Sequence, residues 1–301
     1  MGSLTVTLPP FKIEEVVMPF SEVYDWGLID LGIPDIHKQT MGEGIKIAII
    51  DSGKTTHHEN AHNAMAATNL SDSPVVEDRN GHSSFVSGII GAAKDEEGII
   101  GVAPKAQLYF SKSMNDGGSG SPSALTNGIL WAIQQGVDII SISAGLFSDF
   151  KPLRDAVQQA HAKNITIVAA CGNTGKRYYD IAFPARYPEV IGVAAYSPDH
   201  HTAPFSSRGA NISFAMPGVD IYSCWLNDGY SKSSGTSFAC PILSGTCALI
   251  LAKHRLVGGN TPCTTPQQVY EHLVKYAVKL DDKTDTGFGT IDLKALMQEG
   301  I

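Results

Sequence analysis

The sequence is poor in charge and has no run of basic residues. Only 17% of its 301 residues are charged, and the formal net charge is -8 at pH 7. Because nucleic-acid-binding proteins usually carry a basic patch or stripe, we expect no nucleic-acid partner. The chain also lacks an uninterrupted apolar stretch of about 18 residues, so we expect no membrane span.

Cysteine is scarce, and its spacing suggests no metal site. The five cysteines are an odd number and include no Cys-x-x-Cys pair, so we expect reduced thiols and no zinc centre. Residues 1–7 lack the basic start and the long apolar core of a secretory signal. These two observations together predict a cytoplasmic location.

Short apolar runs alternate with longer stretches of helical length and spacing. This alternation predicts an α/β fold, in which helices cover both faces of a mostly parallel central sheet. The expected strands are residues 45–50, 107–111, 139–142, 165–170 and 190–195, and the expected helices are residues 84–91, 123–135, 153–162 and 240–254.

Three polar residues in distinctive contexts are candidates for catalysis. Asp51 ends an apolar strand and precedes Ser-Gly, His82 follows Asn-Gly, and Ser237 stands in Ser-Gly-Thr-Ser before a helix. A serine hydroxyl becomes a good nucleophile when a histidine takes its proton and a carboxylate orients that histidine. The order Asp, His, Ser is also that of the subtilisin triad.

Further segments extend this pattern along most of the chain. They include Gly-Val-Ala-Pro at 101–104, Ala-Cys-Gly-Asn at 170–173, Phe-Ser-Ser-Arg-Gly at 205–209 and Ala-Met-Pro-Gly at 215–218. With the three candidate residues, they resemble the subtilases, the subtilisin-like serine proteases, from residue 42 to residue 293. The resemblance implies a subtilisin-like three-layer fold and a serine endopeptidase that cuts polypeptides and needs no cofactor for its chemistry. It also implies that Asn173 is the oxyanion-hole asparagine.

The same resemblance implies where substrate binds. Two segments, Gly118-Ser119-Gly120 and Ser143-Ala144-Gly145, resemble the backbone segments that clamp an extended peptide between them in this family. Such strand addition takes its affinity from main-chain hydrogen bonds.

Two places depart from the family pattern. Ser83 follows the catalytic histidine where the family usually has glycine, so packing against the cleft should differ. A loop that often binds structural calcium in the family here contains Asp95 and Glu96, which are possible ligands. Lys94 lies where an oxygen ligand is expected, and its ammonium group could take the place of the ion. Whether this loop binds calcium is therefore left open by the sequence.

Residues 1–26 differ in composition from the rest and form an expected N-terminal extension, and residues 27–301 form the peptidase domain. Leu8-Pro9-Pro10-Phe11 is similar to the Leu-Ile-Pro-Tyr motif of the intracellular subtilisins, which lies across their own active site. Because proline lacks an N–H and has a fixed φ, such a segment can occupy a cleft and present its peptide bond badly. We expect residues 1 to about 20 to inhibit the enzyme. The resemblance also implies a possible homodimer, which nothing in the sequence establishes.

Two other functions remain open at this stage. The chain could be an inactive homologue that keeps the cleft and binds peptides. It could also transfer the acyl group to an amine, as a transpeptidase or macrocyclase does, because that reaction uses the same acyl-enzyme.

Overall fold

A seven-stranded sheet lies at the centre of the computed structural model, which describes residues 4–16, 21–177, 180–257 and 263–298. The strand order is β10–β9–β8–β7–β3–β5–β4, and each neighbouring pair runs parallel. The strands are β3 (Lys46–Asp51), β4 (Ala64–Asn69), β5 (Gln107–Lys112), β7 (Ile139–Ile142), β8 (Thr166–Ala170), β9 (Val190–Tyr196) and β10 (Phe214–Pro217).

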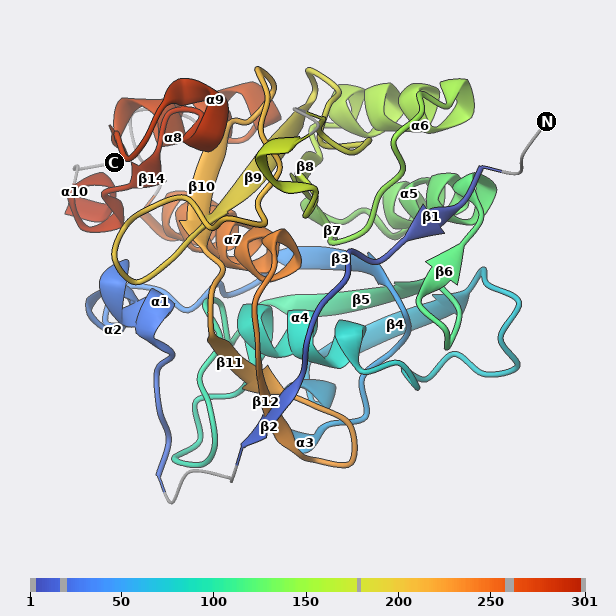
Figure 1. Ribbon diagram of the computed structural model, residues 1–301. Helices are drawn as coiled ribbons and strands as arrows, with labels where there is room; N and C mark the ends of the chain where they lie inside the picture. Colours follow the sequence, from blue (N-terminus) through green and yellow to red (C-terminus); the bar gives the residue numbers. More distant parts are fainter. Residues whose placement is uncertain (1–3, 17–20, 178–179, 258–262, 299–301) are drawn as a thin grey trace.

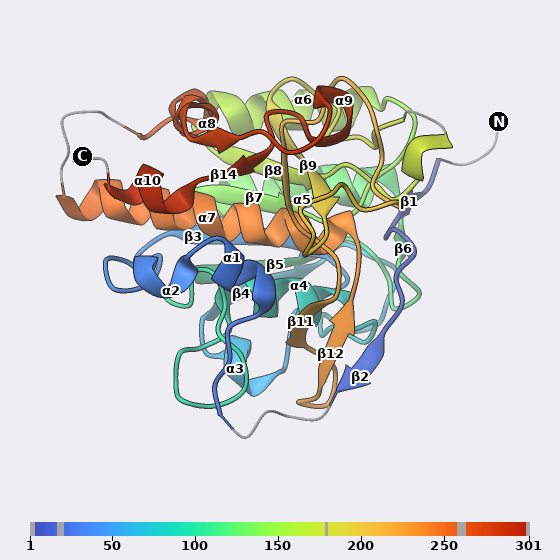
Figure 2. The same ribbon diagram turned by 60° about the vertical axis from the view of Figure 1, so that its left-hand side comes forward.

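Helices cover both faces of this sheet (Figures 1 and 2). α4 (His82–Gly91) and α7 (Thr236–Val257) pack together on one face, and α5 (Pro122–Gln135) and α6 (Lys151–Ala162) pack together on the other. Successive residues of β3 point to opposite faces, so that Ile49 joins the core under α4 and α7 while Ile50 joins the core under α5. The predicted three-layer α/β fold is confirmed.

Smaller elements surround the three layers. They are α1 (Trp26–Asp30), α2 (Ile33–Ile36), α3 (His58–Ala61), α8 (Pro266–Lys275), α9 (Lys283–Thr286), α10 (Leu293–Gln298), a 3-10 turn (Gly175–Arg177), and the strands β6 (Ser119–Gly120), β13 (Ala277–Val278) and β14 (Thr290–Ile291).

The start of the chain lies along the domain as two added strands. β1 (Val6–Thr7) pairs antiparallel with β6. β2 (Glu14–Val16) pairs antiparallel with β12 (Tyr230–Ser233), which in turn pairs with β11 (Ile221–Cys224). Figures 1 and 2 show β2 beside β12, although the two are far apart in sequence. Residues 1–3 and 17–20 of the expected extension lie outside the described residues.

Helix α7 carries the candidate nucleophile at its start and runs through the core. In the described part of the chain, Thr236–Leu256 is the one helical stretch that is long and apolar enough to cross a membrane, and 94% of its apolar window is buried inside the fold. Its apolarity therefore matches its place between the sheet and α4.

Candidate active site

Asp51 and His82 meet at the carboxyl edge of the sheet. Asp51 is the last residue of β3, and His82 is the first residue of α4. Nδ1 of His82 lies 2.9 Å from each carboxylate oxygen of Asp51, and both side chains are buried. A carboxylate at this distance favours the tautomer with hydrogen on Nδ1 and leaves Nε2 free to accept a proton. Nε2 has no hydrogen-bond partner among the residues that the structure describes.

A buried carboxylate that sequence reasoning missed holds the turn before His82. Asp78 accepts hydrogen bonds from the N–H groups of Asn80 and Gly81 and from the hydroxyl of Ser52. Gly81 has φ +94, and a Cβ there would lie 2.4 Å from the ring of Trp225. The Asp-Arg-Asn-Gly stretch at 78–81 was the available signal, because Asp and Asn before Gly favour a tight turn.

Ser237 lies in the first turn of α7, where backbone N–H groups and the helix dipole favour negative charge. Its Oγ donates a hydrogen bond of 3.1 Å to the carbonyl of Ser143, and Oγ of Ser143 donates a bond of 2.8 Å to the carbonyl of Ser237. The serine hydroxyl is therefore turned toward the Ser143 segment, and no hydrogen bond joins it to His82 in the described structure.

Asn173 faces the same point from the loop after β8. Its Oδ1 accepts hydrogen bonds from N–H and Oγ of Thr236, at 3.0 and 2.8 Å. This leaves the Nδ2 group to point into the cleft, where it donates to the carbonyl oxygen of Pro10 at 3.4 Å. The carbonyl of the chain's own extension thus lies against the side chain that the sequence predicts for the oxyanion hole.

Residues 6–8 occupy the two segments that the sequence predicts for substrate. Thr7 and Gly145 exchange backbone hydrogen bonds of 3.1 and 3.2 Å, and N–H of Leu8 donates to the carbonyl of Gly118 at 3.0 Å. Val6 and Thr7 pair with Gly120 and Ser119. Ala144, the residue before Gly145, is buried. An extended strand of the chain itself therefore lies between these two segments, and their role in binding substrate stays a prediction.

Beyond Pro10 the extension continues past His82. The ring of Phe11 lies 5.1 Å from the ring of His82, centroid to centroid, and also contacts Trp225 and Phe238. The next residue, Lys12, accepts a 2.6 Å hydrogen bond at its carbonyl from Oγ of Ser233.

The two departures from the family pattern have different outcomes in the structure. Ser83 is buried, its N–H donates to Oγ of Ser52, and its own hydroxyl has no partner in the described part of the chain. Asp95 and Glu96 lie in an exposed loop, where both of their N–H groups donate to one carboxylate oxygen of Glu22. Lys94 stands over the ring of Tyr24.

One candidate metal-binding group involves other residues. His57, His58 and Asp228 bring three ligand atoms within 4.8 Å of one another, and no other such group occurs among the described residues. Nδ1 of His57 accepts from the N–H of Glu59 and its Nε2 contacts the carbonyl of Gly229, so both ring nitrogens are engaged. Burial lowers the pKa of His57 to about 4.

The candidate calcium loop is a separate site. Asp95 and Glu96 alone supply only part of the six to eight oxygen ligands that calcium takes.

The expectation of no zinc-type spacing overlooked a His-Glu-x-x-His sequence at 58–62. In a zinc protease, this motif lies on a helix with both histidines on the metal and the glutamate free to act as a base. Here α3 is a helix of only four residues, and Glu59 points inward to the N–H of Ile99 and the hydroxyl of Tyr230. The motif therefore does not form a zinc protease site.

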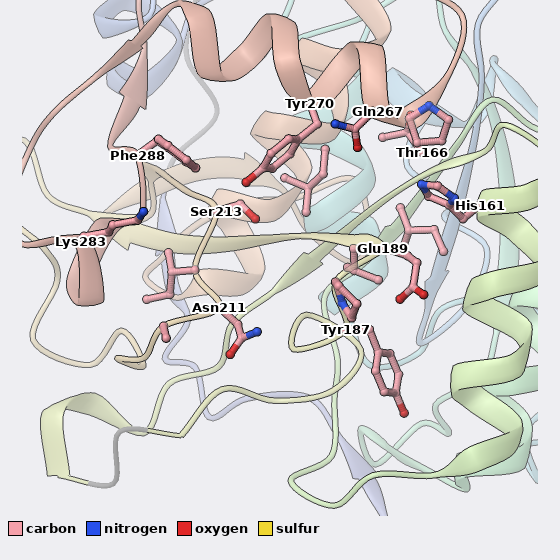
Figure 3. Close-up of a pocket in the computed structure, with 17 residues that line it drawn as sticks. His161, Thr166, Tyr187, Glu189, Asn211, Ser213, Gln267, Tyr270, Lys283 and Phe288 are labelled. Atoms are coloured by element: carbon pink, nitrogen blue, oxygen red, sulfur yellow. The ribbon is translucent and has the colours of Figure 1, made fainter.

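A separate pocket of about 350 Å³ lies away from these residues (Figure 3). It is lined by Thr166 and Val190, the first residues of β8 and β9, and by Tyr270 of α8. Because the strands run parallel, the first residues of β8 and β9 lie at the opposite end of the sheet from Asp51, the last residue of β3. The pocket is therefore not at the carboxyl ends of the strands, where such folds place their catalytic residues. The cleft at His82 is instead filled by the extension.

Comparisons with known proteins agree with this geometry. Residues 42–290 match the model of the subtilase family. The chain is 37% identical to subtilisin DY of Bacillus licheniformis over 259 residues, which cover 85% of this chain and 92% of that protein. It is 32% identical to subtilisin Savinase of Lederbergia lenta, with 90% of this chain and 97% of that protein covered. It is 36% identical to the minor extracellular protease Epr of Bacillus subtilis strain 168, over 90% of this chain and 41% of that protein.

The chain belongs to the subtilase family. It is a subtilisin-like serine endopeptidase, a hydrolase that acts on peptide bonds and needs no cofactor for catalysis. The narrower likeness to the intracellular subtilisins rests on residues 8–11 and stays a prediction.

The predicted cytoplasmic location is wrong on these comparisons, since the relatives include a protein named as an extracellular protease. The composition of residues 1–7 and an odd number of buried thiols are compatible with more than one compartment and do not determine it.

Proposed function

We propose that Ser237, His82 and Asp51 form the catalytic triad, with Asn173 in the oxyanion hole. The observation that carries this proposal is that Nδ1 of His82 lies 2.9 Å from Asp51 at the cleft where Asn173 contacts a peptide carbonyl. The hydrogen bond from Ser237, at the start of α7, to Ser143 supports a place for this serine in the same cleft.

In the proposed reaction, Nε2 of His82 takes the proton of Ser237 as Oγ bonds to the substrate carbonyl carbon. The oxyanion receives hydrogen bonds from Nδ2 of Asn173 and from the backbone N–H of Ser237. The C–N bond then breaks, and His82 gives its proton to the leaving amine. Water repeats the sequence on the acyl-enzyme and releases the acid, while Asp51 stabilises the imidazolium in both halves.

We further propose that residues 1 to about 20 inhibit the enzyme by occupying this cleft. The support is that Thr7, Leu8, Pro10 and Phe11 contact the predicted substrate segments, Asn173 and His82. With the extension bound, the hydroxyl of Ser237 donates to Ser143 rather than to His82. The extension thus both excludes substrate and accompanies an unreactive orientation of the nucleophile.

Replacing the nucleophile tests the catalytic proposal. Ser237→Ala should abolish cleavage of a denatured protein and labelling by an active-site serine reagent, with an unchanged circular dichroism spectrum. A matched Ser123→Ala change, at an exposed serine of α5, should leave both properties as in the parent. Labelling that persists in Ser237→Ala would assign the nucleophile elsewhere, and peptide binding without turnover by the parent would favour the inactive homologue.

The proposed boundary between extension and peptidase domain stays at residues 26 and 27. Gly118, Ser119, Gly120 and Gly145 pair with residues 6–8 of the extension. The two segments that contain them are proposed to hold substrate in the same way, namely Gly118, Ser119, Gly120 and Ser143, Ala144, Gly145. A homodimer stays a prediction that sedimentation can test.

A structural calcium ion at Asp95 and Glu96 is a further prediction. Among the described residues, these two side chains do not belong to a group that could hold a metal ion. Its test is the thermal midpoint, which should fall when a chelator removes bound calcium and recover when calcium is restored. An equal midpoint under both conditions would contradict it.

A further inference from the structure

We propose that the cleft has an aromatic side-chain subsite on the leaving-group side of His82, built by Trp225 and Phe238 and called here the aromatic seat. We infer that the enzyme prefers peptide bonds followed directly by an aromatic residue. This inference rests on the proposed triad and concerns which amine the site holds.

The extension marks which side of the cleft is which. Because Asn173 contacts the carbonyl of Pro10, the residue that follows this carbonyl stands where the leaving amine of a substrate would stand. That residue is Phe11. The aromatic ring of Phe11 is thus the side chain seated next to the leaving nitrogen.

Three rings surround Phe11 in geometries that favour aromatic contacts. Phe238 meets it edge-on, with centroids 6.2 Å apart and planes at 90°, and Trp225 meets it nearly edge-on at 6.4 Å and 71°. His82 is tilted against it at 5.1 Å. Edge-to-face pairs at these distances are favourable beyond the burial of area, so the seat discriminates ring from aliphatic side chains.

The seat is fixed by the packing beneath it. Phe238 is fully buried and lies 4.4 Å from the ring of Phe85, which also contacts Trp225. Trp225 lies against Gly81, where a side chain would have no room. The rings are therefore held in place without Phe11, and an incoming aromatic residue meets a formed site rather than one it must order.

Backbone contacts continue the same path beyond the seat. Ser233 binds the carbonyl of Lys12, and residues 14–16 add to β12 as an antiparallel strand. A peptide that leaves the seat in this direction remains an extended chain. The amine product is thus held on one side of the acyl-enzyme by a side chain and by main-chain bonds.

The seat is tested by offering amines to the acyl-enzyme. A peptide p-nitroanilide acylates Ser237 and releases nitroaniline. In the competing transfer, an amine attacks the ester carbonyl, a C–N bond forms as the C–Oγ bond breaks, and His82 moves the amine proton to Oγ. The ratio of new amide to free acid does not depend on how many molecules have an open cleft, so the full chain can be used.

We expect phenylalanine amide to be about tenfold better than alanine amide at equal concentration, and better than leucine amide, as read by mass spectrometry of the products. The Phe/Ala ratio should fall about threefold or more in Trp225→Leu and in Phe238→Met. Trp131→Leu, which removes another half-buried indole, on α5, is the matched control and should keep the parent ratio.

Equal use of the three amides, or a parent-like ratio in both seat variants, would overturn the aromatic seat while leaving the triad proposal in place. Release of nitroaniline by none of the proteins, either intact or after limited proteolysis has removed the extension, would overturn the proposed function, and the seat would fall with it. Should Trp225→Leu not fold, Phe238→Met alone decides, because methionine keeps the apolar volume and loses only the ring.

Discussion

Phe11→Ala should activate the intact chain. Phe11 is half-buried, and its ring contacts His82, Trp225 and Phe238 in the cleft. Truncating a fully buried phenylalanine to alanine costs about 3–5 kcal/mol, so we expect about 2 kcal/mol at this half-buried position. Since about 1.4 kcal/mol is tenfold, the ratio of closed to open cleft should fall about 30-fold.

The assay is the initial rate of hydrolysis of a short peptide anilide by the full chain. Because the extension is part of the same molecule, the specific activity should rise up to about 30-fold and should not depend on enzyme concentration. Mass spectrometry of each sample after the rate measurement shows whether the chain is still intact. Leu4→Ala is the control, since Leu4 is 43% exposed and lies before β1.

Two results would refute the reasoning. One is a parent rate in intact Phe11→Ala together with no rise when the extension of the parent is cleaved, which would mean that the extension does not inhibit. The other is an equal rise in Leu4→Ala, which would mean that general loosening of the N-terminus, and not the contact with His82, controls the cleft.

The other predictions concern the oxyanion hole, pH and oxidation. Asn173→Ala should lower kcat about ten- to hundredfold with little change in KM, because a hydrogen bond to a developing charge is lost. Glu59, whose pKa burial raises to about 7, stabilises the fold fully below its unfolded pKa of about 4.5, and this contribution is lost as pH rises to about 7. Urea midpoints should therefore fall less over that range in Glu59→Gln than in the parent, and parallel curves would contradict the assignment. Activity should resist peroxide, since Phe238 cannot form a sulfoxide and burial raises the pKa of Cys171 and, to about 11, of Cys240. Rapid peroxide inactivation that persists after both cysteines are replaced would contradict this.

The sheet could be predicted where its strands are buried on both faces. The apolar run at 45–50, interrupted only by Lys46, predicts a strand, and β3 is found at Lys46–Asp51. The two edge strands were not found by the same reasoning. β4 is rich in alanine and has an exposed methionine at Met65, and β10 is short and ends at Pro217. An edge strand pairs on one side only, so its sequence need not be continuously apolar.

The sequence predicts which residues belong to the candidate site, but it does not predict how their side chains are arranged. Asp51, His82 and Asn173 lie in loops or at element ends with distinctive neighbours, and the structure brings them to one cleft. The orientation of the Ser237 hydroxyl and the contact between Phe11 and Trp225 could not be predicted. They depend on how segments that are far apart in the chain pack together, and no local pattern records that.

The extension and a substrate compete for the same groups, so the difference between them must lie in the middle of the segment. On one side Thr7 pairs with Gly145, and on the other Ser233 binds the carbonyl of Lys12. Between these anchors Pro9 and Pro10 offer no N–H, and the fixed φ of each limits how the carbonyl of Pro10 can approach Ser237. Two good anchors around a rigid centre hold a peptide bond beside the nucleophile without aligning it. A substrate with the same anchors and a flexible centre can reach the aligned geometry, and the aromatic seat then strengthens inhibition and turnover through the same side-chain contact.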